Sequence, residues 1–259
     1  MELFSVLVLG LMQGFFEWLP ISSSGQSMIY LLDYAGLDPV TAFSLGIYMH
    51  LGTSAAVLVK YRKTWIGLLN DKRLLRFLLV SSAATGVTGL FLYFLLKSFL
   101  YGFDGVFVNG LVGLSLIVTG VVLHQLHRRG FGRGKLKDLT IWEEITVGLI
   151  QGFSILPGIS RSGVTVAALA LNKLNQTEAL KLSFLMSVPA VVGAVFLELI
   201  TDGAPNIGLV AGLIGVTASF VAGYALMEVL LSMSRKIRFD IFCIIFGLIP
   251  VLAAVKTVF

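Results

Sequence analysis

The sequence predicts an all-α polytopic membrane protein with an inverted repeat. Each half is expected to hold a re-entrant helical hairpin followed by three transmembrane helices, giving six spans and two hairpins. Three observations lead to this prediction: an apolar composition, an internal repeat and basic residues confined to one side. Of the 259 residues, 57% are hydrophobic and 13% are charged, whereas a soluble domain has about 25% charged residues. We expect a single integral membrane domain over residues 1–259, with repeats at 1–127 and 140–259.

Sixteen residues near the start of the chain recur 138 positions later without a gap. Residues 10–25 read GLMQGFFEWLPISSSG and residues 148–163 read GLIQGFSILPGISRSG, with nine identities. Each copy has two apolar arms, too short to span comfortably, on either side of a break rich in proline, glycine and serine. Polar backbone at such a break cannot face lipid, and paired broken helices form binding sites near the bilayer midplane. We interpret both copies as re-entrant hairpins, with arms at 3–18 and 23–36 and at 142–156 and 160–172.

Six further stretches are long and apolar enough to cross about 30 Å of hydrocarbon at about 1.5 Å per residue. Because each half has an odd number of spans, the second half enters from the opposite side. Both hairpins begin Gly-x-x-x-Gly, and the fifth span has similarly spaced small residues, a pattern that allows close helix packing. The alternative interpretation is that this spacing only reflects how frequent glycine is in membrane helices. The spans are expected roughly over residues 39–59, 74–97, 105–127, 177–200, 206–233 and 239–258.

The basic residues indicate the orientation. Sixteen of the nineteen lysines and arginines fall on one side of this arrangement. Because positive loops stay cytoplasmic, we predict a multi-pass plasma-membrane protein whose termini and first hairpin mouth face the extracytoplasmic side. The net charge of +5 then reflects topology, so we expect membrane lipids and no nucleic acid as partners. The basic segments are residues 60–76, 128–141, 173–181 and 234–238, including Arg235 and Lys236.

The two breaks are candidates for an anion site. A residue before proline is pushed away from helical geometry, so the first arms should end at Leu19-Pro20 and Leu156-Pro157. Serines then stand where helix caps are favoured, and the second arms present free N–H groups deep in the membrane. Helix N-termini bind anions. Serines often only cap or bond to local carbonyls, but two matched clusters exceed that need: Ser22, Ser23, Ser24, Ser160 and Ser162.

Charged and amide side chains border the same breaks. Arg161 is the one basic residue left near the membrane interior, where charge marks a functional site, and its planar fork suits phosphate. The alternative is a structural arginine paired with Glu17. Glu17 lies three residues before Pro20 and faces the first break, unless it is a solvated acid at the hairpin mouth. Gln13 could orient a ligand or satisfy backbone, and Thr165 could reach the ligand of Arg161.

Other polar residues fall outside the breaks. His50 and Glu228 lie within spans, where we expect hydrogen-bonded structural roles. His124 and His127 lie at a cytoplasmic helix end and are interpreted as interface residues. The sequence has no paired His/Glu spacing of a zinc enzyme and no P-loop.

At the two breaks the chain resembles the undecaprenyl-diphosphate phosphatase family of the bacitracin-resistance type. The resemblance covers essentially the whole length, in size, span number and both hairpins. Residues 157–165, PGISRSGVT, fit the family signature P-G-x-S-R-S-G-x-T fully. The first break departs from the usual pattern of two glutamates four apart followed by L-P-V-S-S-T-G-H. Gln13, Ser24 and Gln26 stand at the first glutamate, the threonine and the histidine.

The resemblance implies hydrolysis of a polyprenyl (undecaprenyl-type) diphosphate to the monophosphate lipid carrier plus inorganic phosphate at the outer membrane face. Such an enzyme serves lipid-carrier recycling, cell envelope biogenesis and bacitracin resistance. It is expected to need a divalent cation such as Mg²⁺ or Ca²⁺, with Glu17 and Gln13 as the ligands. By position, Glu17 is the essential acid, Ser23 the candidate nucleophile, and Arg161 with Ser160 and Thr165 the phosphate grip. The implied substrate-binding set is Ser22, Ser24, Gly25, Gln26, Ser160, Ser162, Gly163 and Thr165.

Two rival functions fit the same sequence. Inverted repeats with discontinuous helices are common in secondary carriers, so the anion pocket could belong to a transporter or flippase for an anionic or lipid-phosphate substrate. A non-catalytic lipid-binding protein is a further alternative, because the first glutamate of the motif is absent. For the enzyme, a phosphoserine intermediate and direct attack by water both remain open. The polyprenyl diphosphate is the expected partner, and a homodimer is left open.

Overall fold

The structure, a computed structural model, describes residues 2–205, 207–234 and 238–258. Regular secondary structure in these ranges is helical, apart from one isolated bridge between Gly134 and Leu174. The all-α class is therefore confirmed. Two residues of the expected basic set, Arg235 and Lys236, lie outside the described ranges.

Six of the described helices are long and apolar enough to cross a membrane, which makes this a multi-pass membrane protein. Four of them start at an Asp or Asn whose carboxyl or amide oxygen accepts from the backbone three residues later. Such residues are preferred N-caps, so the loop sequences set where these helices begin. The six helices are α3 (Pro39–Lys60), α5 (Lys72–Leu100), α6 (Gly105–Arg129), α9 (Gln176–Thr201), α10 (Leu209–Ser234) and α11 (Phe239–Val258).

The two repeated segments form pairs of shorter helices. In the first, α1 (Leu3–Phe16) is followed by α2 (Ser23–Ile29), which continues as a π-helical turn at Tyr30–Tyr34. In the second, α7 (Ile141–Gly152) and a 3₁₀ turn at Phe153–Ile155 precede α8 (Arg161–Leu171). The first arms thus leave α-helical geometry earlier than expected: α1 ends at Phe16, before Pro20, and α7 ends at Gly152, before Pro157. The remaining short helices are α4 (Arg62–Ile66) and the 3₁₀ turns Leu68–Asn70 and Leu136–Asp138.

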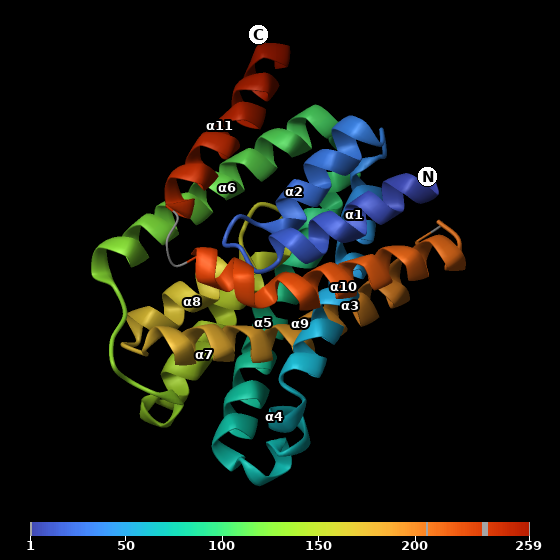
Figure 1. Ribbon diagram of the computed structural model, residues 1–259. Coiled ribbons are helices and arrows are strands. Elements are labelled where there is room, and N and C mark those ends of the chain that lie inside the picture. The colour runs from blue at the N-terminus through green and yellow to red at the C-terminus, as the bar shows by residue number, and fades with distance from the viewer. Residues whose placement is uncertain (1, 206, 235–237, 259) are drawn as a thin grey trace.

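Each repeat packs its first arm on a helix of the other half. Helix α1 lies along α10, α7 lies along α5, and α6 pairs with α11, as Figure 1 shows. Gly10 faces the backbone carbonyl of Gly215 on α10, and Gly148 faces that of Ser81 on α5. A side chain at either glycine would overlap these carbonyls. The expected close approach of helices at the Gly-x-x-x-Gly motifs is therefore confirmed, and the motifs lie at interfaces between the halves.

The connections rich in basic residues gather at one end of the molecule. One hydrophobic cluster includes Trp65 of α4, Phe131 and Leu136 after α6, and Leu174 after α8. Backbone hydrogen bonds join Gly132 and Gly134 to the segment after α8. In Figure 1, α4 lies at the bottom, whereas the N-terminal end of α1 and the C-terminal end of α11 lie in the upper part.

Candidate active site

The first break is held against the second by one serine. Ser22 adopts a left-handed φ of 60° and caps α2. Its Oγ accepts from the amide of Gly25, at 3.2 Å, and from the amide of Gly158 in the other hairpin, at 3.1 Å. A Cβ on Gly25 would lie 3.0 Å from the Cα of Gly158. The two breaks are therefore in direct contact.

The second break is anchored on α6. Ser160 caps α8 by accepting from the amide of Gly163 at 3.2 Å. The hydroxyl of Thr119 on α6 donates to the carbonyl of Gly158, at 2.9 Å, and accepts from the amide of Ser160, at 3.0 Å. Gly158 has a φ of +98°, and a Cβ there would overlap the carbonyl of Val112 on α6. Both the backbone conformation and the close contact therefore require glycine.

Glu17 is the centre of a buried polar cluster that joins the two hairpins. Its Oε1 accepts from Arg161 Nη2 at 2.6 Å. Its Oε2 accepts from Ser23 Oγ at 2.6 Å and from Gln13 Nε2 at 2.8 Å. Arg161 also donates through Nη1 to the carbonyl of Ser183 on α9, at 3.0 Å. The structure thus brings together the three residues expected to be catalytic: Glu17, Ser23 and Arg161.

These contacts decide between some of the alternatives that the sequence left open. Glu17 is only 6% exposed, so it is not a solvated acid at a hairpin mouth. The ion pair between Glu17 and Arg161 is present, as the structural interpretation of Arg161 requires. Arg161 nevertheless lines a cavity, so it can also contact a ligand. The Gln13 amide positions the Glu17 carboxylate rather than a backbone group.

His50 of α3 also lies at this cluster. Its Nε2 is 3.4 Å from Glu17 Oε2, and its Nδ1 is 2.7 Å from the carbonyl of Gly46. The expected hydrogen-bonded structural role covers only the second contact. Sequence reasoning missed the first because His50 is 33 residues from Glu17 in the chain, on a helix that belongs to neither hairpin motif. Its only signal was a histidine inside an apolar span.

A cavity of about 500 Å³ opens beside the cluster. Ser24, His50 and Arg161 contribute polar groups to it. Much of the remaining wall comes from apolar residues and glycines of α3, α5 and α9, such as Phe43 and Leu90. A polar, cation-bearing patch joined to an apolar chamber suits an amphiphile with an anionic head group.

The other residues of the expected substrate-binding set lie elsewhere around the breaks. Thr165 is fully buried behind Arg161, with its hydroxyl 2.7 Å from the Arg161 carbonyl and 2.5 Å from Ser183 Oγ. Gln26 lines neither this cavity nor the second one described below. Among that set, only Ser24 shares the first cavity with Arg161.

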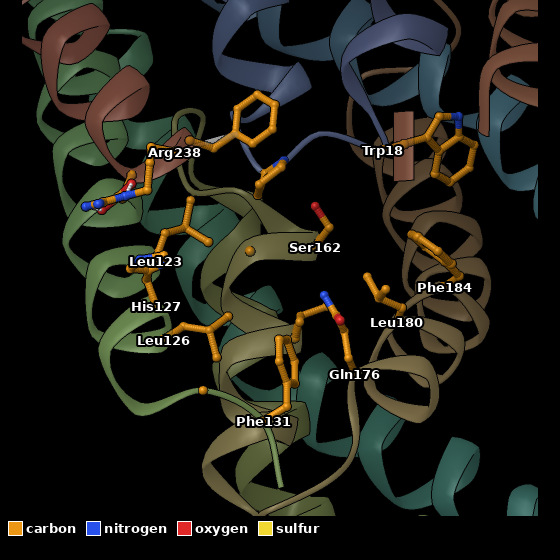
Figure 2. A pocket seen from close by; sticks show the side chains of 16 residues that line it. Trp18, Leu123, Leu126, His127, Phe131, Ser162, Gln176, Leu180, Phe184 and Arg238 are labelled. Atoms are coloured by element: carbon orange, nitrogen blue, oxygen red, sulfur yellow. Dashed lines mark hydrogen bonds and ion pairs between the residues drawn. The ribbon is translucent and has the colours of Figure 1, made fainter. Parts of the chain in front are cut away.

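Ser162 and Gly163 line a second cavity, of about 320 Å³, together with the ends of α6, α9 and α11 that lie near the basic connections. Figure 2 shows Ser162 of α8 between Trp18 and Phe184 on one side and Leu123 and His127 on the other. Of the two histidines interpreted as interface residues, His127 lines this cavity, whereas His124 bonds Asp240 on α11 at 3.0 Å. Glu228 pairs with Lys60 on the protein surface.

The donor set around Glu17 can be tested for a divalent cation. Among the described residues, no group of three or more His, Cys, Asp or Glu side chains could hold a metal ion. Gln13 Oε1 is, however, buried without a hydrogen-bond partner, next to the Glu17 carboxylate. Mg²⁺ usually binds one or two carboxylates together with substrate phosphates and waters. One carboxylate and one amide oxygen do not form a closed protein site, so an ion held by Glu17 and Gln13 would need further ligands from substrate or water.

Comparison with known proteins decides the family. The family model described as bacitracin resistance protein BacA matches residues 6–249. The chain belongs to the BacA family. An undecaprenyl-diphosphatase of Methanothrix thermoacetophila is 40% identical over 250 residues, which cover 96% of each chain.

More distant BacA-type relatives carry the same printed name. The undecaprenyl-diphosphatase of Methanopyrus kandleri is 35% identical, with 97% of this chain and 96% of the relative covered. That of Carboxydothermus hydrogenoformans is 34% identical, with 91% and 90% covered. The likeness to BacA proteins therefore extends over most of the chain, including both repeated segments.

Proposed function

We propose that this protein hydrolyses undecaprenyl diphosphate, or a closely related polyprenyl diphosphate, to the monophosphate and inorganic phosphate. The relatives described above are named for this substrate and reaction class. The observation that carries the proposal is the contact of one buried carboxylate, Glu17, with both Ser23 and Arg161 beside a largely apolar cavity. Phosphoryl transfer depends on positioning, proton transfer and charge stabilisation, and a carboxylate, a hydroxyl and a guanidinium at one point can supply all three.

The geometry supports a short reaction path. The terminal phosphoryl group lies against Arg161, whose guanidinium offsets the charge that develops in the transition state. Glu17 Oε2 takes the proton of Ser23 as the Ser23 Oγ bonds to phosphorus. Alternatively, Glu17 Oε2 takes the proton of a water that Ser23 orients. The bond from phosphorus to the bridging oxygen breaks, and the prenyl monophosphate leaves with that electron pair. After attack by Ser23, a water then cleaves the phosphoserine, which releases inorganic phosphate and restores the hydroxyl; after attack by water, inorganic phosphate forms directly. Both forms of attack use the hydrogen bond that already joins Ser23 to Glu17.

A divalent cation, such as Mg²⁺ or Ca²⁺, belongs to this proposal. Glu17 and Gln13 are the residues that would hold it, since the Gln13 Oε1 atom is free of protein partners. When bound, the ion would neutralise phosphate charge.

The membrane arrangement proposed here is an inverted repeat with two re-entrant hairpins, an extracytoplasmic active site and both termini outside. The exchanged pairing supports the repeat, because α1 lies on α10 just as α7 lies on α5. The basic connections at one end support the orientation, because positively charged loops stay in the cytoplasm. The first cavity is lined by the parts of α3, α5 and α9 that lead away from that end.

The direct test is phosphate release from farnesyl or undecaprenyl diphosphate by the protein purified in detergent, with and without a chelator. We expect turnover that the chelator abolishes. Removing a charge-stabilising or proton-accepting group costs about 100- to 10,000-fold in rate, so Glu17→Gln and Arg161→Ala should each lose nearly all activity. Each variant must elute as a folded protein in size-exclusion chromatography. Unchanged turnover in folded Arg161→Ala would refute the site.

A carrier is the second candidate, and one observation favours it. Two separate cavities lie at the breaks, and residues of both breaks line each one: Ser24 and Arg161 line the first, and Pro20 and Ser162 line the second. Such a layout resembles the paired access routes of inverted-repeat transporters. Flux of a prenyl monophosphate across liposomes, without phosphate release and lost in Arg161→Ala, would favour the carrier.

A further inference from the structure

His50 is the histidine that lies at the Glu17 cluster. The chain has three histidines, and the other two are on α6: His124 bonds Asp240, and His127 lines the second cavity. His50 Nε2 lies 3.4 Å from Glu17 Oε2, and the side chain keeps 19% of its surface exposed. His50 also lines the first cavity, as Arg161 does. The ring is therefore both at the reacting cluster and accessible to a ligand.

The ring is held in one orientation by the backbone of its own helix. Nδ1 lies 2.7 Å from the carbonyl oxygen of Gly46, one turn earlier. A carbonyl only accepts, so Nδ1 is the donor in this bond. Such a bond fixes which nitrogen is left for other partners. Here Nε2 is left, and it faces Glu17 and the cavity.

The polar cluster around Glu17 has little positive charge to offer a diphosphate besides what His50 could add. Glu17 and Arg161 cancel each other, whereas a diphosphate head group carries several negative charges. Among the described residues that line the first cavity, Arg161 and His50 have side chains that can carry positive charge. Buried phosphate needs donors and positive charge to offset its loss of hydration. Arg161 already donates hydrogen bonds to Glu17 and to the Ser183 carbonyl.

The first break does not supply an imidazole of its own. Residues 17–26 contain serines and Gln26 but no histidine. Gln26 lines neither cavity, and its Nε2 is buried without a partner. In this chain, the imidazole at Glu17 comes from α3 instead.

Building on the proposed phosphatase function, we propose that His50 is a substrate-binding residue of the active site. Its Nε2–H donates to a phosphoryl oxygen of the diphosphate, next to Arg161 and opposite Ser23. His50 would thus set both the affinity for the diphosphate head group and the position of its terminal phosphoryl group.

The test uses the full-length protein in detergent and two readouts. The first is binding of farnesyl methylenediphosphonate, which retains the charges of a diphosphate but has no P–O–P bond to break. The second is phosphate release from farnesyl diphosphate. The variants are His50→Leu, which removes the donor, and His50→Gln, which keeps a neutral donor. His124→Leu is the matched control, because Asp240 keeps its bonds to Arg238.

A hydrogen bond to a charged group corresponds to about 10- to 100-fold in affinity. We expect His50→Leu to weaken diphosphonate binding by that factor and to lower kcat/KM at least as much. His50→Gln should retain part of the binding, and His124→Leu should match the unmodified protein. All variants should keep the same unfolding midpoint.

The outcomes separate this inference from the proposed reaction. Absent phosphate release by the unmodified protein would refute the reaction, but selective loss of diphosphonate binding in His50→Leu would still support the contact. Binding and turnover in His50→Leu within twofold of the unmodified protein would overturn the His50 assignment. So would failure of the unmodified protein to bind the diphosphonate, or equal effects of the His50 and His124 substitutions.

Discussion

Two glutamines at matching repeat positions differ in their surroundings. Gln13 and Gln151 are both fully buried, and each leaves its Oε1 without a partner. The Gln13 amide donates to Glu17, whereas the Gln151 amide donates to Thr85 Oγ1 at 3.0 Å and to the Met186 carbonyl at 3.3 Å. The hairpin fold therefore accepts the same side chain in both copies, but only the first copy places it at a carboxylate.

A second buried ionic cluster lies away from the Glu17 centre. Lys97 on α5 donates to Glu198 Oε1 at 2.8 Å and to Asp202 Oδ2 at 2.6 Å. Glu198 is fully buried, and it also accepts from Tyr93 at 2.6 Å and from Ser44. The cluster therefore ties α3, α5 and α9 together beside the first cavity. Burial opposes ionisation of Asp202, but hydrogen bonds from Lys97 and Thr201 outweigh it and hold its pKa below the usual value.

We expect Lys97→Met to destabilise the protein by about 3–5 kcal/mol, because it leaves the buried Glu198 charge without its cation. Replacing both partners with apolar residues is often nearly neutral. The double variant Lys97→Met/Glu198→Leu should therefore recover most of the loss. The unfolding free energy in detergent measures both. A single variant as stable as the unmodified protein would contradict the ionic role of Lys97.

At the scale of helices, the first arms depend on backbone contact with the opposite half. Gly148 of α7 faces the Ser81 carbonyl of α5, so Gly148→Leu should push the two helices apart. Overpacking of this kind costs about 1–3 kcal/mol or more. Thr146→Leu is a matched control, because position 146 is on the same helix and exposed.

Thermal unfolding should show a lower midpoint for Gly148→Leu and little change for Thr146→Leu. Displacement of α7 should also move the second break, so activity should fall with stability. Equal midpoints for the two variants would mean that α7 and α5 do not need this close contact.

Glycines also make room inside the first cavity. Gly86 of α5 lines that cavity, and a Cβ there would meet nothing within 4 Å. Gly86→Leu should therefore leave stability nearly unchanged but fill part of the chamber. If the prenyl chain occupies this space, the variant should lose more activity on an undecaprenyl substrate than on a farnesyl substrate.

The ratio of kcat/KM for the two chain lengths measures this effect. Val87→Leu is the control, because Val87 is 67% exposed on the outer surface of the same helix. A ratio that stays constant in Gly86→Leu would place the prenyl chain outside the cavity.

For the whole molecule, the proposed orientation predicts where each connection can be labelled. In a Cys243→Ala background, Ala204→Cys, in the connection before α10, should react with a membrane-impermeant maleimide on intact cells. Lys137→Cys, in the basic connection before α7, should react only after the cells are opened. Positions 204 and 137 are both exposed. The reverse pattern would place the active-site cavity on the cytoplasmic side.

The sequence by itself determined the helical membrane class, the six spans and the two serine-rich breaks. It also selected Glu17, Ser23 and Arg161. These features follow from local composition and from a repeated motif, so they do not depend on which distant residues meet. Helix ends were predicted less well, because the chain leaves α-helical geometry before each proline.

Only the tertiary structure decided which groups share a cavity. His50 reaches Glu17 from a separate helix, Thr165 lies behind Arg161, and Ser162 faces a different cavity from Ser24. The physical reason is that such neighbours come from the packing of α3, α6 and α9 around the breaks. Distances between side chains on different helices depend on that packing, and spacing along one chain does not encode them.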